Sequence, residues 1–388
     1  MRLAIAEWSG ELLLPQFPSP LPARLWYINA GRLKRVATTP GIPQPLQSLL
    51  KQSSRSFFLS LAVLPRALRG PIGLAYLLAR AADTIADTRA LPPTDRLRQL
   101  AIVRGALDVP QAPRLREISE VLQVGRSAAW ERELIARLPE CHALLWQAET
   151  GDRERIRGLL HLLVQGMQHE LELFPAEGEG RIVALETRED LLRHAYYAAG
   201  CVGEFWTGMG VAHCPGLRHW NVPRLARRGV RFGQGLQLTN ILRDLARDLR
   251  IGRCYLPRQD LDRYRLAPEE LLDPAALPRL RPLLEELIQL TLECYADGRE
   301  YTLAVPRREF RLRLACAWPL LIGLATLARI RRGPDLLNPA VPIKIRRTEV
   351  YGILARSTAV AWWDGGFARY WRILEADVVA PLLPEADR

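Results

Sequence analysis

The sequence has little lysine and no long uncharged run. Only Lys34, Lys51 and Lys344 are lysines among the 54 basic residues, so arginine supplies almost all of the positive charge. The most hydrophobic stretch, 314–328, has 15 residues, whereas a membrane-spanning helix needs about 20. We therefore predict a buried core helix there and no transmembrane anchor.

Cysteine is also scarce. None of the six cysteines forms a C-x-x-C pair, which argues against a disulfide framework and against a structural zinc site. Glu7 interrupts the start of the chain before any apolar stretch long enough for a secretion signal. These absences predict a cytoplasmic protein, with peripheral contact to the inner face of the membrane left open.

The charge is one-sided, because 54 Lys and Arg residues stand against 42 Asp and Glu residues and leave a net charge of +12. Guanidinium groups suit phosphate oxygens, so the partner can be nucleic acid, anionic lipid or a diphosphate. The basic residues are interleaved with acidic ones and no known nucleic-acid motif occurs, so we predict no nucleic acid partner. A basic helical module that binds an anionic membrane stays open as an alternative.

Alternating β-branched runs are almost absent, and from Leu46 onward apolar residues recur every three or four positions. This pattern predicts an all-α protein of about ten helices, with prolines such as Pro71 at the joints. Helical spacing covers 46–64, 71–88, 95–107, 114–123, 131–148, 153–173, 188–211, 222–249, 278–305, 308–331 and 348–377. We expect three parts: a Pro-rich, loosely ordered leader (1–45), one all-α domain (46–377) and a C-terminal tail (378–388).

Two of the predicted helices carry a polar stripe on an otherwise apolar surface. In the first, steps of four, three and four residues separate Tyr76, Arg80, Asp83 and Asp87. In the second, steps of three, four and four residues separate Gln237, Asn240, Asp244 and Asp248. Such steps place each set on one face of its helix. Carboxylates buried in this way are costly unless they are paired or bind a cation.

The stripes match the needs of magnesium and diphosphate. Mg²⁺ takes one or two carboxylates together with phosphate oxygens and water. Two facing helices can therefore hold ions around one diphosphate, while Arg80 and Arg243 stabilise charge on a leaving diphosphate. The alternative for each stripe is a set of surface salt bridges between Asp and Arg at helical spacing. The spacing alone leaves both interpretations open.

Five segments stand out by their character and their order. They are SSRSFFLSLAVLP (53–65), YLLARAADTIADT (76–88), YYAAGCVGEF (196–205), GLQLTNILRDLARDLRIGRCYLP (235–257) and CAWPLLIGLATL (316–327). Together they resemble the squalene/phytoene synthase family over roughly residues 50–350. The resemblance implies a prenyltransferase with the isoprenoid synthase fold, a single-domain helical bundle around a central active-site cavity.

Two features resemble the squalene synthase branch of that family. Tyr197 stands directly before the AAG of the third segment, and PIKIRRTEVYGIL (342–354) contains Lys344 and Arg346. The resemblance implies that two farnesyl diphosphate molecules condense to presqualene diphosphate, which NADPH reduces to squalene for sterol or hopanoid biosynthesis. The alternative is a phytoene, dehydrosqualene or presqualene diphosphate synthase that uses no NADPH. A partner that has kept the fold without catalysis is disfavoured by the intact aspartates.

The resemblance also implies roles for individual residues. Mg²⁺ or Mn²⁺ would be held by Asp83, Asp87, Asp244 and Asp248, which together with Tyr197 for a proton step form the catalytic set. The substrate and its diphosphate would contact Ser54, Arg55, Ser56, Phe57, Tyr76, Arg80, Gln237, Asn240, Arg243 and Arg253. NADPH would contact Arg55, Arg80, Arg243, Lys344 and Arg346. Ala86 and Arg247 stand where glutamate is common in the family, which leaves the number of ions open.

Overall fold

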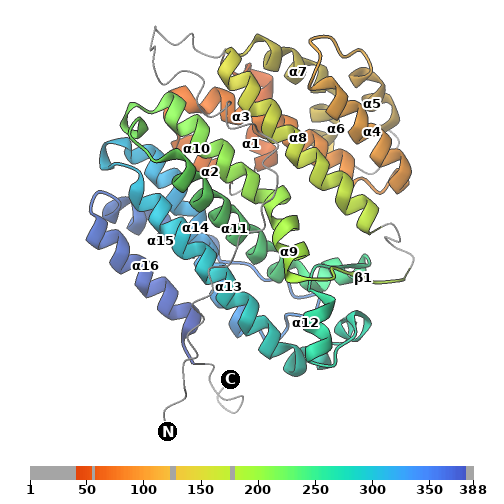
Figure 1. Ribbon diagram of the computed structural model, residues 1–388, viewed down its shortest axis with the longest axis vertical. Coiled ribbons are helices and arrows are strands. Elements are labelled where there is room, and N and C mark those ends of the chain that lie inside the picture. Colours follow the sequence, from red (N-terminus) through yellow and green to blue (C-terminus); the bar gives the residue numbers. More distant parts are fainter. Residues whose placement is uncertain (1–40, 55–56, 123–127, 175–179, 382–388) are drawn as a thin grey trace.

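The computed structural model describes residues 41–54, 57–122, 128–174 and 180–381, which are mostly helical (Figure 1). The first half contains α1 (Gln44–Ser54), α2 (Phe57–Val63), α3 (Arg66–Asp87), α4 (Pro93–Ala106), α5 (Leu115–Leu122), α6 (Ala129–Ala136), α7 (Leu138–Gln147), α8 (Thr150–Leu173) and α9 (Arg188–Ala195). The second half contains the π-helical turn η2 (Tyr196–Gly200), α10 (Cys201–His213), α11 (Val222–Arg250), α12 (Arg258–Arg263), α13 (Leu277–Ala304), α14 (Phe310–Arg332), α15 (Arg347–Val360) and α16 (Asp364–Val379). Short 3₁₀ turns are η3 (Pro215–Leu217), η4 (Pro268–Leu272), η5 (Pro274–Ala276) and η6 (Arg307–Glu309). The all-α prediction is confirmed.

The described residues contain one small exception to the helical pattern, a parallel pair of two-residue strands. Strand β1 (Val183–Ala184) pairs with β2 (Arg253–Cys254), with Val183 opposite Arg253. Gly252 precedes β2 and has a φ of 86°, a left-handed conformation that glycine adopts without steric cost. It ends α11 and turns the chain sharply. The strand pair then fixes Arg253 just beyond the second aspartate stripe.

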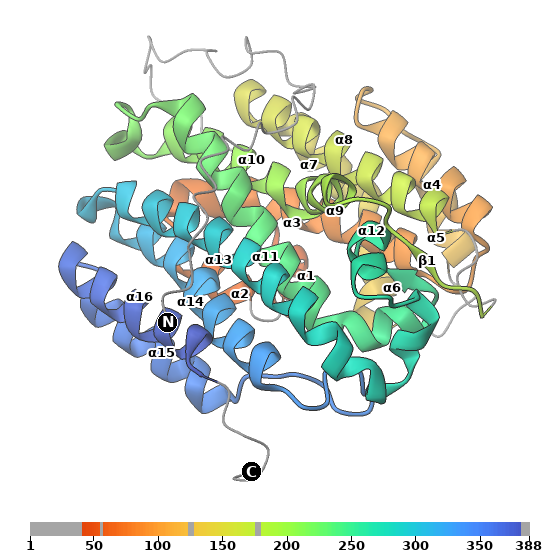
Figure 2. The same ribbon diagram turned by 60° about the horizontal axis from the view of Figure 1, so that its bottom comes forward.

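Helix α11 is the central element of the bundle. It packs against α9, α10, α13 and α14, and it lies between the group α4–α8 and the pair α15–α16 in both views (Figures 1 and 2). Its closest neighbour is α10, because a Cβ atom on Gly203 would lie 2.0 Å from the carbonyl oxygen of Gly229. Only glycine allows two backbones to approach so closely. This contact holds the turn η2 beside α11.

Helix α14 runs through the core. Together with the preceding turn it forms the span Arg307–Arg332, which is long and apolar enough to cross a membrane, but 72% of the most apolar window is buried inside the protein. It packs against α2, α11, α13, α15 and α16. The prediction of a buried core helix at 314–328 is therefore confirmed, and Pro319 lies inside this helix without ending it.

Several predicted boundaries are wrong. The segment 348–377 forms two helices, because the chain turns back after α15 and lays α16 over α14, while the apolar pattern continues across the turn. The segment 131–148 divides into α6 and α7, where Pro139 occupies the first turn of the new helix, a position that proline favours. Pro71 lies buried inside α3 rather than at a joint. About ten helices was therefore too low a number for the described residues.

The outer parts of the predicted domain division are little described. Most of the expected leader lies outside the described residues, and α1 begins at Gln44, within the expected leader. At the other end α16 extends to Val379, just inside the expected tail. The division into leader, domain and tail stays a prediction.

Candidate active site

The first aspartate stripe lies along α3, whose other faces are buried. Arg80 forms an ion pair with Asp83, and its guanidinium also lies 3.7 Å from Glu131 and 5.1 Å from the ring centre of Trp130. Asp87 ends the helix and is exposed. The side chain of Asp83 is 37% exposed, so this carboxylate is still reachable from solvent.

Tyr76, at the start of the same stripe, has a structural contact. Its hydroxyl donates a hydrogen bond of 2.9 Å to the backbone carbonyl of Ser53 at the end of α1. Four further predicted substrate contacts follow Ser53 directly in the sequence. Arg55 and Ser56, and the side chains of Ser54 and Phe57, lie outside the described part of the structure.

The second stripe lies along α11 on a face that stays partly open to solvent although this helix is central. Arg243 forms a two-pronged pair with its neighbour Asp244, with N–O distances of 3.0 and 2.6 Å. Arg247 lies 3.6 Å from Asp248 and 3.8 Å from Asp244. Earlier in the same helix, the side-chain amide of Asn240 donates a hydrogen bond of 3.4 Å to the side-chain oxygen of Gln237. The arginines therefore offset the carboxylates of this stripe.

Glu170 on α8 is the centre of a polar cluster formed with residues of α9 and of the segment after α11. Its carboxylate pairs with Arg253, accepts a hydrogen bond of 3.0 Å from the hydroxyl of Tyr255, and lies 3.7 Å from Nδ1 of His194. Its negative charge also contributes to raising the pKa of both Asp83 and Asp248. That the two stripes face each other around one diphosphate stays a prediction.

Two aspartates of the stripes have raised pKa values. Burial raises the pKa of Asp83 to about 7, with repulsion from Asp87 adding to it and Arg80 opposing it. Burial likewise raises the pKa of Asp248 to about 7, with Arg247 opposing the shift and Asp244 adding to it. Burial and neighbouring carboxylates together outweigh the attraction of the nearby arginines for these two groups. Perturbed acids that cluster in this way are typical of functional sites.

The donor set fits magnesium. Within the described ranges, no three ligating side chains converge closely enough to hold a metal by themselves. Mg²⁺ does not require such a cage, because it keeps several waters and takes substrate phosphate oxygens along with one or two carboxylates. The open, mutually repelling carboxylates of Asp83, Asp87, Asp244 and Asp248 suit this mode.

Tyr197 borders a pocket of its own beside α8. It belongs to the π-helical turn η2, an irregularity often found at functional sites, and its Cβ packs against Gly166 of α8. It borders a pocket of about 260 Å³, whose other lining residues are Arg104, Gln165, Gln168, His169, Glu172 and Arg193. None of the four aspartates lines this pocket. The role of Tyr197 beside the aspartates stays a prediction.

Lys344 and Arg346 lie in the connection between α14 and α15, which Figure 2 shows along one end of the molecule. Both are exposed, and neither forms an ion pair with another residue in the described ranges. They differ in this from Arg80, Arg243 and Arg253, each of which pairs with a carboxylate.

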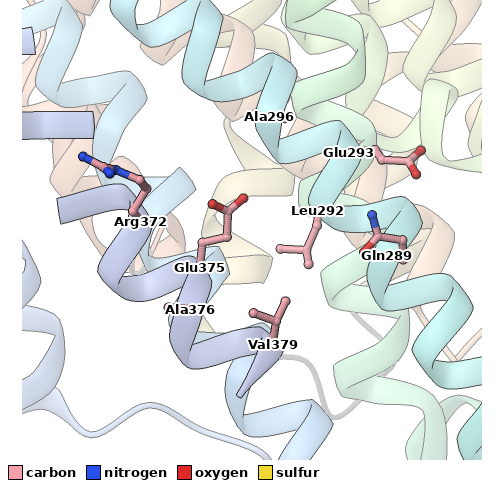
Figure 3. Close-up of a pocket in the computed structure, with 8 residues that line it drawn as sticks. All are labelled: Gln289, Leu292, Glu293, Ala296, Arg372, Glu375, Ala376 and Val379. Atoms are coloured by element: carbon pink, nitrogen blue, oxygen red, sulfur yellow. The ribbon is translucent and has the colours of Figure 1, made fainter. Parts of the chain in front are cut away.

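A larger groove lies elsewhere on the molecule. It has a volume of about 420 Å³ between α13 and α16, with Leu292, Ala296, Ala376 and Val379 among its lining residues and Glu293, Arg372 and Glu375 around them (Figure 3). No residue predicted from the sequence to act in catalysis lines it.

Sequence reasoning missed the cluster around Glu170. His194 stacks on Tyr255 with ring centres 4.6 Å apart, and burial lowers the pKa of this imidazole. Nothing in the spacing separates Glu170 from Glu172, which is exposed on the same helix. Only the contacts of Glu170 with Arg253, Tyr255 and His194 distinguish the two.

Comparisons with known proteins show what this chain is similar to. A family model described as squalene/phytoene synthase matches residues 50–349. The squalene synthase of Schizosaccharomyces pombe is 25% identical over 347 residues, 85% of this chain and 69% of that protein. The 15-cis-phytoene synthase of a Paracoccus species is 27% identical over 296 residues, 73% and 80% of the two chains. A solved ligand complex of TcSQS has a TM-score of 0.69 at 21% identity and covers 87% of this chain and 93% of that one, which confirms the isoprenoid synthase fold.

Proposed function

Because the chain belongs to the squalene/phytoene synthase family and is therefore a prenyltransferase, we propose that it joins two farnesyl diphosphate molecules head to head. We further propose that the product is squalene, formed through presqualene diphosphate. The observation that carries the proposal is the pair of partly exposed aspartate stripes on α3 and α11, in each of which an arginine pairs with an aspartate. Two acidic stripes of this kind suit a substrate that brings diphosphate groups.

The residues of the stripes have distinct roles in this proposal. Asp83, Asp87, Asp244 and Asp248 would hold Mg²⁺, which when bound supplies positive charge to offset that of a leaving diphosphate. Arg80 and Arg243 each pair with an aspartate in the structure. When Mg²⁺ binds those aspartates, the two guanidinium groups would become free to bind phosphate oxygens. Gln237 and Asn240 extend the polar face of α11 toward the substrate chain.

The allylic cation formed on ionisation must be kept from water. Partly exposed apolar side chains continue the open face of α11 beyond Asn240, with Leu236 the nearest, and such a lining disfavours water. Tyr197 stays our candidate for the proton step. Arg104 and Arg193 line the same pocket as Tyr197, and positive charge near a phenol would favour its use as a base. Tyr197→Phe in the product assay tests this role.

The reductive half of the proposal concerns the exposed segment after α14. Lys344 and Arg346 are unpaired cations in the described chain and fit the phosphate groups of NADPH, which when bound supplies hydride. The competing proposal is a synthase that stops at phytoene, dehydrosqualene or presqualene diphosphate. The similarity to a phytoene synthase supports it, whereas Tyr197 and the 342–354 segment support reduction to squalene.

A product assay separates these possibilities. Purified protein is incubated with farnesyl diphosphate and Mg²⁺, with and without NADPH, and the extracted products are identified by mass spectrometry. We expect squalene with NADPH and presqualene diphosphate without it. Dehydrosqualene or presqualene diphosphate as the sole product despite NADPH would remove the role of Lys344 and Arg346. If the protein turns over only a longer prenyl diphosphate, that compound takes the place of farnesyl diphosphate as the proposed substrate.

The aspartates are tested in the same assay. Asp83→Asn or Asp248→Asn should lower turnover at least about 100-fold, because each removes charge that organises the departing diphosphate. Asp335→Asn is the control, since this exposed aspartate lies in the connection after α14 and forms no ion pair in the described chain. Equal activity of all three variants would refute the assignment of the stripes.

A further inference from the structure

Two neighbouring tryptophans stand out on the surface. Trp362 is 57% exposed and Trp363 is 63% exposed, and both lie in the turn between α15 and α16. Large apolar side chains that face water are costly, so a consecutive exposed pair calls for an explanation. The pair is also the most exposed tryptophan surface in the described part of the chain.

The structure holds both indole rings in place. Trp362 stacks on Phe310 at the start of α14, with ring centres 3.8 Å apart and an angle of 14° between the planes. Trp363 rests against the first turn of α16, where a Cβ atom on Gly366 would lie 2.6 Å from its ring. Each ring therefore has one supported face and one free face. Fixed rings lose little conformational entropy when they bind a partner.

Positive charge surrounds the two rings. Arg307 and Arg308 precede Phe310 and Arg311 follows it, and all three arginines are exposed. Arg311 donates a hydrogen bond of 2.8 Å to the carbonyl of Val63, which ties this corner to the end of α2. Arg66 and Arg69 lie at the start of α3. Burial lowers the pKa of Arg69, and repulsion from Arg311 and Arg66 adds to this shift.

The acidic groups at this corner are already engaged. Asp364 next to Trp363 pairs with Arg307 at 2.6 Å and with the buried Arg313. The carboxylate of Glu309 accepts a hydrogen bond of 2.9 Å from the backbone of Gly216. The corner thus keeps a net positive charge. We call the two tryptophans and the five arginines (Arg66, Arg69, Arg307, Arg308 and Arg311) the Trp–Arg patch.

We propose that the Trp–Arg patch docks the protein on the anionic surface of a lipid bilayer. Indole rings favour the headgroup region of a membrane, where one side is apolar and the other is wet, and arginine pairs with lipid phosphates. The choice of a bilayer over nucleic acid rests on the proposed function, because a C30 hydrocarbon product needs an apolar phase to enter. Docking through this corner leaves α14 in the core and requires no spanning helix.

The test measures co-sedimentation of the full chain with vesicles and needs no substrate, so its outcome is independent of the product assay. We expect binding to vesicles that contain phosphatidylglycerol and little binding to pure phosphatidylcholine, with affinity falling as salt rises. Trp362→Ala combined with Trp363→Ala should weaken binding about tenfold or more. Arg66→Gln combined with Arg308→Gln should reduce it similarly.

The matched control removes two arginines at a distance. Arg98 on α4 and Arg116 on α5 are exposed and lie on the opposite side of the molecule from α15 and α16 (Figures 1 and 2). Arg98→Gln combined with Arg116→Gln should leave vesicle binding near that of the wild type, and melting curves check that every variant is folded. The proposal would be overturned if the control variant lost as much vesicle binding as the patch variants. It would also be overturned if the wild type bound equally well to anionic and to neutral vesicles. Self-association or oligonucleotide binding that depends on the tryptophans, without vesicle binding, would assign the patch to those partners instead.

Discussion

The hydroxyl of Tyr255 donates a hydrogen bond of 3.0 Å to the carboxylate of Glu170. This contact joins the segment that follows α11 to the middle of the bundle on α8. Arg253 pairs with the same carboxylate, so strand β2 is tied to α8 through two neighbouring side chains. The end of α11, which carries the second aspartate stripe and precedes β2, is thereby anchored to α8.

The first prediction concerns the loss of this connection. Glu170→Gln leaves the nearly buried guanidinium of Arg253 without its carboxylate, and should lower the free energy of unfolding by about 3 kcal/mol. Removing the charge should also lower the pKa of Asp83 and Asp248, because Glu170 raises both. Chemical denaturation measures the first effect, and the pH dependence of turnover measures the second.

The control for this variant is Glu172→Gln on the same helix. Glu172 is exposed, so its neutralisation should change the free energy of unfolding by less than about 0.5 kcal/mol. If both variants are equally stable, the pair between Glu170 and Arg253 does not stabilise the fold.

The second prediction concerns pH and stability without metal. The pKa of Asp83 and of Asp248 is about 7 in the folded protein, against 3.8 for an ordinary aspartate. Between pH 4 and 7 the unfolded chain has lost protons that the folded protein still holds, so these two groups make the folded state less stable as pH rises. The double variant Asp83→Asn/Asp248→Asn should therefore gain in Tm over the wild type as pH rises from 4 to 7, with the difference levelling above 7.

Magnesium provides the internal control for that experiment. At pH 8 added Mg²⁺ should raise the Tm of the wild type, because bound cations offset the repulsion, and should leave the double variant nearly unchanged. A difference in Tm that stays constant across the pH range would contradict the raised pKa values.

The third prediction separates the two half-reactions. Lys344→Gln combined with Arg346→Gln should raise the KM for NADPH about tenfold or more, because each loses a charged contact to phosphate. Formation of presqualene diphosphate should continue at the wild-type rate. Arg347→Gln, at the adjacent exposed position, is the control. Equal losses in both half-reactions would place the segment in folding or in general substrate binding.

The fourth prediction tests the contact between α10 and α11. Gly203→Ala forces a methyl group against the carbonyl oxygen of Gly229 and should lower the free energy of unfolding by about 1–3 kcal/mol. Gly352→Ala in α15 is the matched control, because nothing lies within 4 Å of the added methyl. That variant should gain up to about 1 kcal/mol, since alanine favours a helix over glycine. Thermal or urea unfolding compares the two.

The sequence by itself determined the helical class and both aspartate stripes. Steps of three and four residues put Asp83 with Arg80, and Asp244 with Asp248, on single helix faces, because the geometry of an α-helix is local. The buried helix at 314–328 followed in the same way from its length and its lack of charge. The order of the five matching segments then indicated the family.

Only the tertiary structure decided which residues of distant helices contact one another. Glu170 has no periodic pattern that marks it out from Glu172, and its contact with Arg253 spans 83 residues of sequence. The sequence did not show that Tyr197 borders a pocket together with Arg104 and Arg193, which lie far from one another in the sequence. The turn that exposes Trp362 and Trp363 lies within a continuous apolar pattern, so the break between α15 and α16 was invisible. Contacts between distant helices depend on how their surfaces pack, and no local spacing records that.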